Sequence, residues 1–260
     1  MSFRGVFLQC GCVQHPYQYN AHMIVSTQGI VLQSIKYSDN SLIVKIFTKK
    51  HGVISFIVKN AFSKKSKQPS SYFSPLTILD IIYNETSTEK LTFLKEVTIA
   101  HPFHAIHHDI RKNSILLFYQ ELLMKLLYHA NAPDESLFDF IKEHLLKLEV
   151  TQNPAPDFHI VFLVQLIQQL GYTPEINFSL QTPHFSIEDS NFGSYFIETP
   201  LFLSKEASYY LFTILKKQNH TIPDKKTRME LLNGMILYLM KNNKQIKGIE
   251  SVAILSEVLN

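Results

Sequence analysis

Short runs in which apolar and polar residues alternate occupy residues 23–100 of the chain. The runs are rich in Val, Ile, Phe, Tyr and Thr, and clusters of Ser, Asn, Gly, Pro and Lys separate them, a pattern that predicts β-strands. In Ser41–Thr48 one face carries Leu42, Val44 and Ile46, and the other carries Ile43, Lys45 and Phe47. This period of two is typical of a strand with one buried face. The predicted strands cover residues 28–36, 41–48, 53–59, 76–83 and 91–99.

The segment between the second and third predicted strands reads as a hairpin turn. Lys49, Lys50, His51 and Gly52 connect the two runs, with glycine where the turn requires a positive φ. Five short strands in residues 23–100 suit a small Greek-key barrel of the oligonucleotide-binding (OB) type. An SH3-like barrel would give a similar pattern, so periodicity alone leaves both open.

A helical period replaces the alternation after Pro102. The apolar face of the first predicted helix is formed by Ile106, Ile110, Leu117, Leu122 and Leu126. A second helix carries Leu137, Phe138, Ile141, Leu145 and Leu148. A third runs from Phe158 to Leu170, after Pro156 and before Gly171, which are typical helix boundary residues. We therefore expect an α+β protein with a helical domain over residues 101–260.

Residues 172–203 interrupt the helical pattern. Pro174, Pro183, Gly193 and Pro200 stand there among scattered aromatic residues, which predicts an irregular or short-stranded insertion. Helices resume at Ser204, a favourable N-cap, and near Thr227, whose spacing to Glu230 matches a capping box. The expected organisation is an extension over residues 1–22, a barrel over 23–100 and a helical domain over 101–260 that contains the insertion.

The overall composition limits the class of protein. Hydrophobic residues make up 45% and charged residues 18% of the chain, as in folded globular proteins. We find no apolar run of about 20 residues, the length of a membrane helix, and no signal-peptide core. Cys10 and Cys12 are too close for a disulfide and have only His15 and His22 nearby as further metal ligands, which favours free thiols in a reducing cytoplasm.

Positive charge is concentrated in the barrel region. Residues 1–100 contain 11 Lys and Arg against 5 Asp and Glu, residues 101–170 contain 5 against 8, and residues 171–260 contain 9 against 9. This asymmetry indicates a polyanionic partner for the first part of the chain, most simply nucleic acid.

A lysine-rich loop after the third predicted strand is the main candidate site. Lys59, Lys64, Lys65 and Lys67 stand among small and polar residues, and such loops bind phosphates with release of counterions. The simpler alternative is a loop that serves only solubility. We assign these four lysines, together with Lys45 on the second strand, to contacts with DNA phosphates.

Aromatic residues near this loop strengthen the nucleic-acid interpretation. Phe47, Phe56 and Phe62 are candidates to stack on bases. For Phe47 and Phe56 the alternative is burial in the barrel or in its contact with the helices, so Phe62 is the preferred stacking residue.

A histidine cluster at the start of the helical region suggests an alternative function. His101, His104, His107, His108 and Asp109 resemble metal ligands, and a metal-dependent hydrolase is one alternative; a scaffold with a protein-binding barrel is another. The cluster lacks an HExxH arrangement, and the chain has no GxSxG, glycine-rich phosphate loop or CxxC motif. We therefore predict no enzymatic activity, no metal and no cofactor.

Several sequence segments resemble RecO, a family of bacterial recombination mediators. In the barrel region they are GIVLQSIKYSDNSLIVKIFTKKHG from Gly29, VKNAFSKKSK from Val58 and YFSPLTILDI from Tyr72. In the helical region they are YQELLMKLL from Tyr119, SLFDFIKEHLLKL from Ser136 and FLVQLIQQLGYTPEI from Phe162. The resemblance implies an OB fold that binds single- and double-stranded DNA and anneals complementary strands. It also implies cooperation with RecR in loading RecA onto strands coated by single-strand-binding protein.

The chain departs from the family pattern in three places. Many relatives carry four zinc-binding cysteines after the LGYxPE segment, where residues 177–196 contain none, so zinc is not expected. The insertion would have to be held by its own aromatic residues, Phe178, Phe185, Phe192, Tyr195 and Phe196. The family usually has Gly and Arg where this chain has Asn60 and Phe62; Asn tolerates positive φ, but a phosphate contact is lost. Residues 1–22 have no counterpart, which indicates a disordered extension or a misplaced start.

Overall fold

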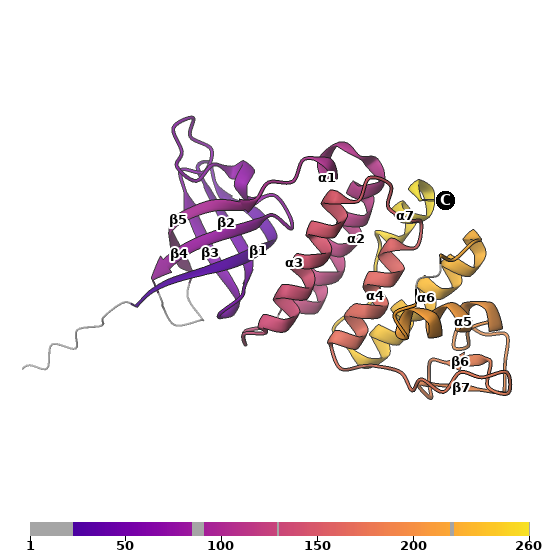
Figure 1. Ribbon diagram of the computed structural model, residues 1–260. Helices are drawn as coiled ribbons and strands as arrows, with labels where there is room; N and C mark the ends of the chain where they lie inside the picture. Colours follow the sequence, from indigo (N-terminus) through magenta and orange to yellow (C-terminus); the bar gives the residue numbers. More distant parts are fainter. Residues whose placement is uncertain (1–22, 85–90, 129, 219–220, 260) are drawn as a thin grey trace, which may run out of the picture.

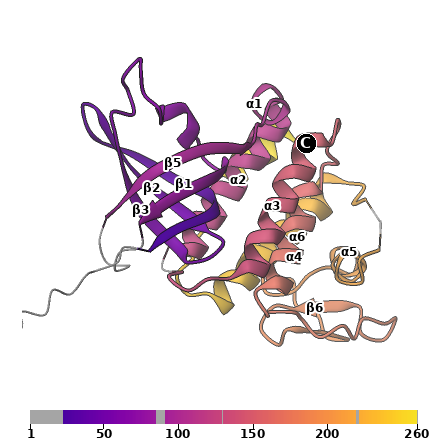
Figure 2. The ribbon, with the colours of Figure 1, turned by 60° about the vertical axis from the view of Figure 1, so that its left-hand side comes forward.

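The computed structural model describes residues 23–84, 91–128, 130–218 and 221–259. A β-barrel and a group of helices lie side by side, and the short helix α1 stands where the chain passes from one to the other (Figure 1). Figure 2 shows the same arrangement from a second side. The expectations for residues 1–22, including Cys10 and Cys12, lie outside the described residues.

The barrel has the strand order of an OB fold. Its strands are β1 (Ile24–Ser38), β2 (Ser41–Thr48), β3 (Gly52–Lys59), β4 (Ile78–Asn84) and β5 (Thr92–His101). They close in the order β1-β2-β3-β5-β4, with β4 antiparallel to β1 and β3 parallel to β5. The five-stranded OB barrel is thereby confirmed, and the turn at Gly52 has the expected positive φ of 66°.

The alternating pattern of the strands divides the barrel into an inner and an outer face. Val44 and Ile46 point inward and are fully buried, whereas Lys45 between them is half-buried on the outer face. Ile30, Val31 and Leu32 in β1 are all buried, because one face of β1 meets the barrel core there and the other meets the helices. Ile30 and Leu32 accordingly belong to the core of the helical domain.

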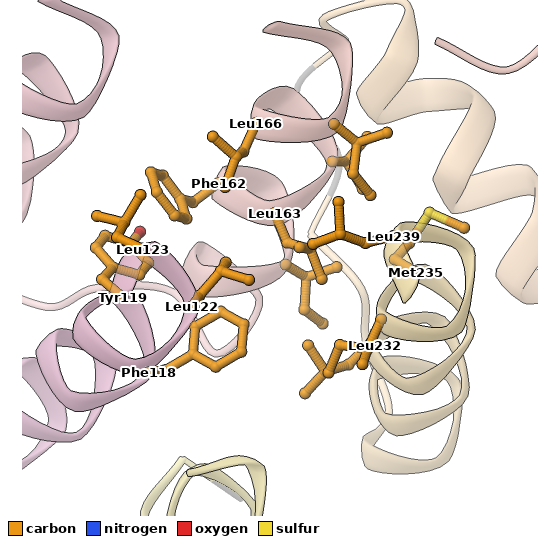
Figure 3. Packing of buried hydrophobic residues seen from close by; sticks show 14 of the residues in the cluster. Phe118, Tyr119, Leu122, Leu123, Phe162, Leu163, Leu166, Leu232, Met235 and Leu239 are labelled. Atoms are coloured by element: carbon orange, nitrogen blue, oxygen red, sulfur yellow. The ribbon is translucent and has the colours of Figure 1, made fainter. Parts of the chain in front are cut away.

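The helical domain is built around α4. Its helices are α1 (Ala105–His108), α2 (Ile110–Leu127), α3 (Glu135–Val150), α4 (Phe158–Gln169), α5 (Lys205–Leu215), α6 (Lys225–Asn242) and α7 (Val252–Val258). In Figure 3, Phe162 on α4 lies toward Tyr119 on α2, and Leu163 lies toward Leu239 on α6. The ring centroids of Tyr119 and Phe162 are 3.8 Å apart, so α4 connects the two longest helices through buried apolar contacts.

The predicted apolar face of the first long helix is correct only in part. Leu122 and Leu126 are buried, but Ile110 is 72% and Leu117 is 39% exposed. The reason is helical geometry: the five residues from Leu117 to Leu122 rotate the helix by about 500°, which places the two side chains roughly 140° apart. By contrast, all five apolar residues predicted for the second helix are buried.

The predicted capping residues of the last helices are correct at one helix and wrong at another. Ser204 caps α5, because its hydroxyl accepts from the backbone N–H of Ala207 at 3.3 Å. At α6 the N-cap is Asp224, which accepts from the N–H of Thr227 at 2.8 Å, so the capping box of Thr227 and Glu230 is wrong. The Glu230 carboxylate accepts instead from the backbone N–H and the hydroxyl of Ser204.

The insertion contains a small hairpin held by aromatic side chains. Its strands are β6 (His184–Ser186) and β7 (Asn191–Gly193). Phe185 and Phe192 are buried in contact, and Phe178 stacks on Phe212 of α5 with a centroid distance of 5.1 Å. These contacts confirm the expected aromatic packing for three residues. The other two candidates, Tyr195 and Phe196, are 66% and 41% exposed.

A carboxylate from α3 fixes the connection between the barrel and the helices. Glu149 accepts from the backbone N–H groups of His104, Ala105 and Ile106 at 2.8 to 2.9 Å. Burial favours a higher pKa of Glu149, but these hydrogen bonds outweigh it and lower the pKa. The ionised carboxylate therefore stabilises the start of α1.

Replacing Glu149 with glutamine should weaken this connection. The amide keeps one acceptor oxygen and turns an NH₂ group toward the donors, so we expect the free energy of unfolding to fall by about 1 to 2 kcal/mol. Urea denaturation at pH 7 measures the change. Glu143→Gln on the same helix is the control, because Glu143 is exposed; equal losses in both variants would contradict the role of Glu149.

Candidate nucleic-acid interface

The lysine-rich loop is fastened to the barrel at its start. Asn60 has a φ of 58°, so this residue makes the expected turn in place of glycine. The Asn40 side chain donates to the Asn60 side-chain oxygen, and the N–H of Ala61 donates to the Asn40 carbonyl, both at 3.0 Å. Because Ala61 is 2% exposed in the barrel core, the loop begins from a fixed point beside the β1–β2 turn.

Hydrogen bonds inside the loop hold its remaining backbone. The Ser66 hydroxyl accepts from the N–H of Gln68 at 3.1 Å, and the Gln68 amide donates to the Lys95 carbonyl of β5 at 3.2 Å. The loop then enters a 3-10 helix, Ser70–Phe73, which places Phe73 in the barrel core. The loop thus lies across one end of the barrel, and its lysine side chains are left on the outside.

Within the described part of the chain, no carboxylate compensates the charge of the loop lysines. Lys59, Lys64, Lys65 and Lys67 are exposed, and no carboxylate of the described residues lies within 4.0 Å of any of their ammonium groups. Lys49, by contrast, is 2.7 Å from Asp139 at the domain contact. The loop therefore presents a positive surface available to an anionic ligand.

The three candidate stacking residues have different environments. Phe62 is 46% exposed, and the Lys36 ammonium lies 5.8 Å from its ring centroid. Phe56 is fully buried against Tyr83, and Phe47 is fully buried against Phe138 of α3. Phe47 and Phe56 are therefore buried, as the alternative interpretation expected: the first fills the domain contact and the second the barrel, which leaves Phe62 as the candidate stacking residue.

The outer face of the barrel beside the loop carries an apolar row that sequence analysis missed. The strand register aligns Ile35 with Ile43, Ile43 with Ile57, and Ile57 with Phe93. Phe93 is 53% exposed, and the Lys59 ammonium lies 4.8 Å from its ring centroid. Alternation could have revealed Phe93, because it stands between the buried Thr92 and Leu94 and must point outward.

Lys45 lies at the other end of this face, away from the loop. Ser41 pairs with Lys59, whereas Lys45 pairs with Gln33 and Ser55 four residues further along β2. Its ammonium is 3.4 Å from the ring centroid of Tyr128, at the end of α2. The predicted DNA-binding residues therefore occupy two places on one face: Lys45 beside the helices, and the remaining five at or near the loop.

The histidine cluster shows no metal-binding arrangement in residues 23–84, 91–128, 130–218 and 221–259. No group of three or more His, Cys, Asp or Glu residues there could hold a metal ion. His104 and His107 line a cavity of about 350 Å³ together with serine and threonine residues of the barrel.

The part of the chain that the structure describes contains no helix that is both long and apolar enough to span a bilayer.

The barrel, its basic and aromatic outer face and the attached helices define an OB-fold protein suited to nucleic acid. Residues 23–103 match the family described as Recombination protein O N terminal, and residues 107–208 match Recombination protein O C terminal. The chain therefore belongs to the RecO family of DNA-binding repair proteins, which act in recombination and have no catalytic role.

Individual relatives support this assignment over most of the chain. The DNA repair protein RecO of Flavobacterium psychrophilum is 33% identical over 241 residues, which cover 92% of this chain and all of that protein. The RecO of Flavobacterium johnsoniae is 33% identical over 69% of this chain and 75% of its own length. The RecO of Bacteroides fragilis is 31% identical over 66% of this chain and 71% of its own length.

Proposed function

We propose that this protein binds single-stranded DNA across the outer face of the barrel and anneals complementary strands during recombinational repair. The observation that carries the proposal is the lysine loop: its lysines and Phe62 are exposed, and the Lys59 ammonium lies 4.8 Å from the ring centroid of the exposed Phe93. The proposed phosphate ligands are Lys45, Lys59, Lys64, Lys65 and Lys67, and Phe62 is the proposed stacking residue in the loop.

The chemistry of this face suits binding without sequence preference. Lysines neutralise phosphates and release counterions, which supplies free energy independent of the bases. An aromatic ring stacks on any base. Both contacts leave the hydrogen-bonding edges of the bases accessible to a second strand, which is what annealing requires. Duplex DNA offers the same phosphates, so binding to it should rest on charge alone.

The proposed cellular role includes protein partners. We infer that the protein acts with RecR to load RecA onto single strands coated by single-strand-binding protein, with RecA contacted only indirectly. Membership of the RecO family supports this role. The barrel would hold the DNA while the helical domain provides the docking surface for these proteins.

Removing the loop lysines tests the proposal. We expect Lys64→Ala, Lys65→Ala and Lys67→Ala together to weaken binding of a single-stranded oligonucleotide at least tenfold. The slope of log K against log salt concentration should become shallower by roughly 2, because each single-strand phosphate contact contributes about 0.7. Fluorescence anisotropy over a salt series measures both quantities.

The control removes the same charge elsewhere. Lys205, Lys216 and Lys226 are exposed on the helical domain, and their triple alanine variant should keep the affinity and the slope of the unmodified protein. If both triple variants lose affinity equally, only net charge matters and the loop is not the binding site. An unchanged slope in the loop variant would contradict the proposal directly.

A further inference from the structure

An exposed aromatic ring stands where the barrel face meets the helices. Tyr128 directly follows the last residue of α2 and is 50% exposed. The Lys45 ammonium lies 3.4 Å from the centroid of its ring. The ring belongs to the helical domain and the ammonium to β2 of the barrel, so this contact bridges the two parts of the protein.

Backbone contacts fix this ring relative to the barrel. The N–H of Val53 at the start of β3 donates to the carbonyl of Ala130 at 2.8 Å. The same carbonyl, together with that of Ala132, fills the space beside the α-carbon of Gly52. Residues 130–132 are therefore held against the β2–β3 turn, close in sequence to Tyr128 at the edge of the outer face.

The exposed face of the barrel runs up to Tyr128 and ends there. Alternate residues of β2 point to the same side, so Ser41, Ile43 and Lys45 form one line along the outer face. Phe47 continues the line but is fully buried against Phe138. Lys45 is thus the last accessible position before the domain contact, and Tyr128 lies beside it.

We propose that Tyr128 is a base-stacking residue that extends the single-strand path from the barrel onto the end of α2. This inference rests on the proposed function. When a strand binds, Lys45 would move from the ring to a phosphate, and a base would take its place on the ring. The exchange is favourable because the ring replaces its cation–π contact with base stacking while the freed ammonium gains a phosphate.

A single tryptophan can report this contact directly. The chain contains no tryptophan, so Tyr128→Trp provides the only indole emission. We expect an oligothymidine to quench this emission at the concentrations at which anisotropy detects binding. Duplex DNA, whose bases are already stacked in pairs, should bind without comparable quenching. The control is Tyr195→Trp in the insertion, where the tyrosine is 66% exposed and where we expect no quenching.

Affinity measurements give a second, independent test. Tyr128→Ala should weaken single-strand binding roughly 5- to 150-fold, which corresponds to the loss of one stacked base, and should leave the salt slope unchanged because no charge is removed. Tyr128→Phe, which keeps the ring, should bind single strands as tightly as the unmodified protein. Thermal unfolding of all three Tyr128 variants identifies any variant that fails to fold. If Tyr128→Ala or Tyr128→Trp fails to fold, Tyr128→Phe still preserves the aromatic ring.

The outcomes separate this inference from the proposed function. Salt-dependent binding by the unmodified protein, without quenching in Tyr128→Trp and without loss of affinity in Tyr128→Ala, would overturn the role of Tyr128 and leave the loop intact as the binding site. No salt-dependent binding by the unmodified protein would overturn both. Equal quenching at residues 128 and 195 would also contradict a specific contact at Tyr128.

Discussion

Replacing Gly52 with alanine is expected to lower the free energy of unfolding by about 2 to 5 kcal/mol. A Cβ at residue 52 would lie 2.5 Å from the carbonyl oxygen of Ala130 and 2.6 Å from that of Ala132. Both are backbone atoms, which cannot rotate away as the end of a side chain can. The positive φ of 66° adds the strain of a left-handed conformation.

A second glycine separates the two contributions. Gly171 has a φ of 81°, but apart from its chain neighbours no atom of the described residues lies within 4 Å of the Cβ position. Gly171→Ala should therefore lose only the conformational part, about 1 to 2 kcal/mol. Thermal and urea unfolding of both variants measure the difference. Equal losses would show that the contact between the β2–β3 turn and residues 130–132 does not stabilise the protein.

The contact between Gly52 and residues 130–132 also predicts how firmly the barrel is held to the helices. Gly52, the first residue of β3, packs against residues 130–132, so its replacement should loosen the barrel from the helices as well as destabilise the fold. Limited proteolysis at a temperature where Gly52→Ala remains folded should cut the domain connection faster than in Gly171→Ala. Equal cleavage rates would indicate that Phe47, Phe138 and the ion pair of Lys49 are sufficient to hold the domains together.

Most of the barrel could be predicted because strand pattern and strand environment agree there. The alternation in Ser41–Thr48 correctly separates Val44 and Ile46 in the barrel core from Lys45 on the outer face. Phe47, which follows Lys45 in the outer line, shows the limit of this argument. Alternation places it outside the barrel, but only the tertiary structure shows that α3 covers that part of the outer face.

Errors in the helical domain arise where a local pattern competes with packing. Thr227 and Glu230 have the spacing of a capping box, yet the helix begins earlier, at Asp224, and Glu230 reaches Ser204 of α5 instead. The sequence contains both possible partners of Glu230. Only the packing of α6 beside α5 decides between them, and a local pattern contains no information about that packing.

The candidate site was predictable where it is continuous in sequence and not where it is assembled by the fold. The lysines between residues 59 and 67 form one loop, so their composition revealed them. The contact of Lys45 with Tyr128 joins residues from different domains, and nothing in either local sequence indicates it. Phe93 is an intermediate case, since alternation shows that it points outward but not that β5 brings it beside Lys59.

His159 should make the protein unstable in mildly acidic solution. Its side chain lies in α4, is 4% exposed, and packs edge-on against Phe118 with a centroid distance of 5.8 Å. Among the described residues its Nδ1 atom has no hydrogen-bond partner. Burial, with a smaller contribution from the nearby charge of Arg228, lowers the pKa of His159 from 6.5 to about 3.

The sign of the effect follows from the direction of this shift. The folded protein keeps the ring neutral, whereas the unfolded chain takes up a proton near pH 6.5, so acid favours unfolding. The stability is complete above pH 6.5 and is lost progressively as the pH falls toward 3. At about 1.36 kcal/mol per pH unit, the loss between pH 7 and pH 5 amounts to about 2 kcal/mol.

Urea denaturation of the unmodified protein and of His159→Gln, at pH 7 and pH 5, measures this loss. The glutamine variant should be less stable at pH 7 but should lose about 2 kcal/mol less between the two pH values. Glu121, whose pKa is lowered to about 2, affects stability only below about pH 4.5 and therefore does not interfere.

Tyr119→Phe is the control. Burial raises the pKa of this tyrosine, so the residue does not titrate between pH 5 and pH 7, and the variant should follow the pH dependence of the unmodified protein. If His159→Gln follows it too, the acid sensitivity in this range comes from another group.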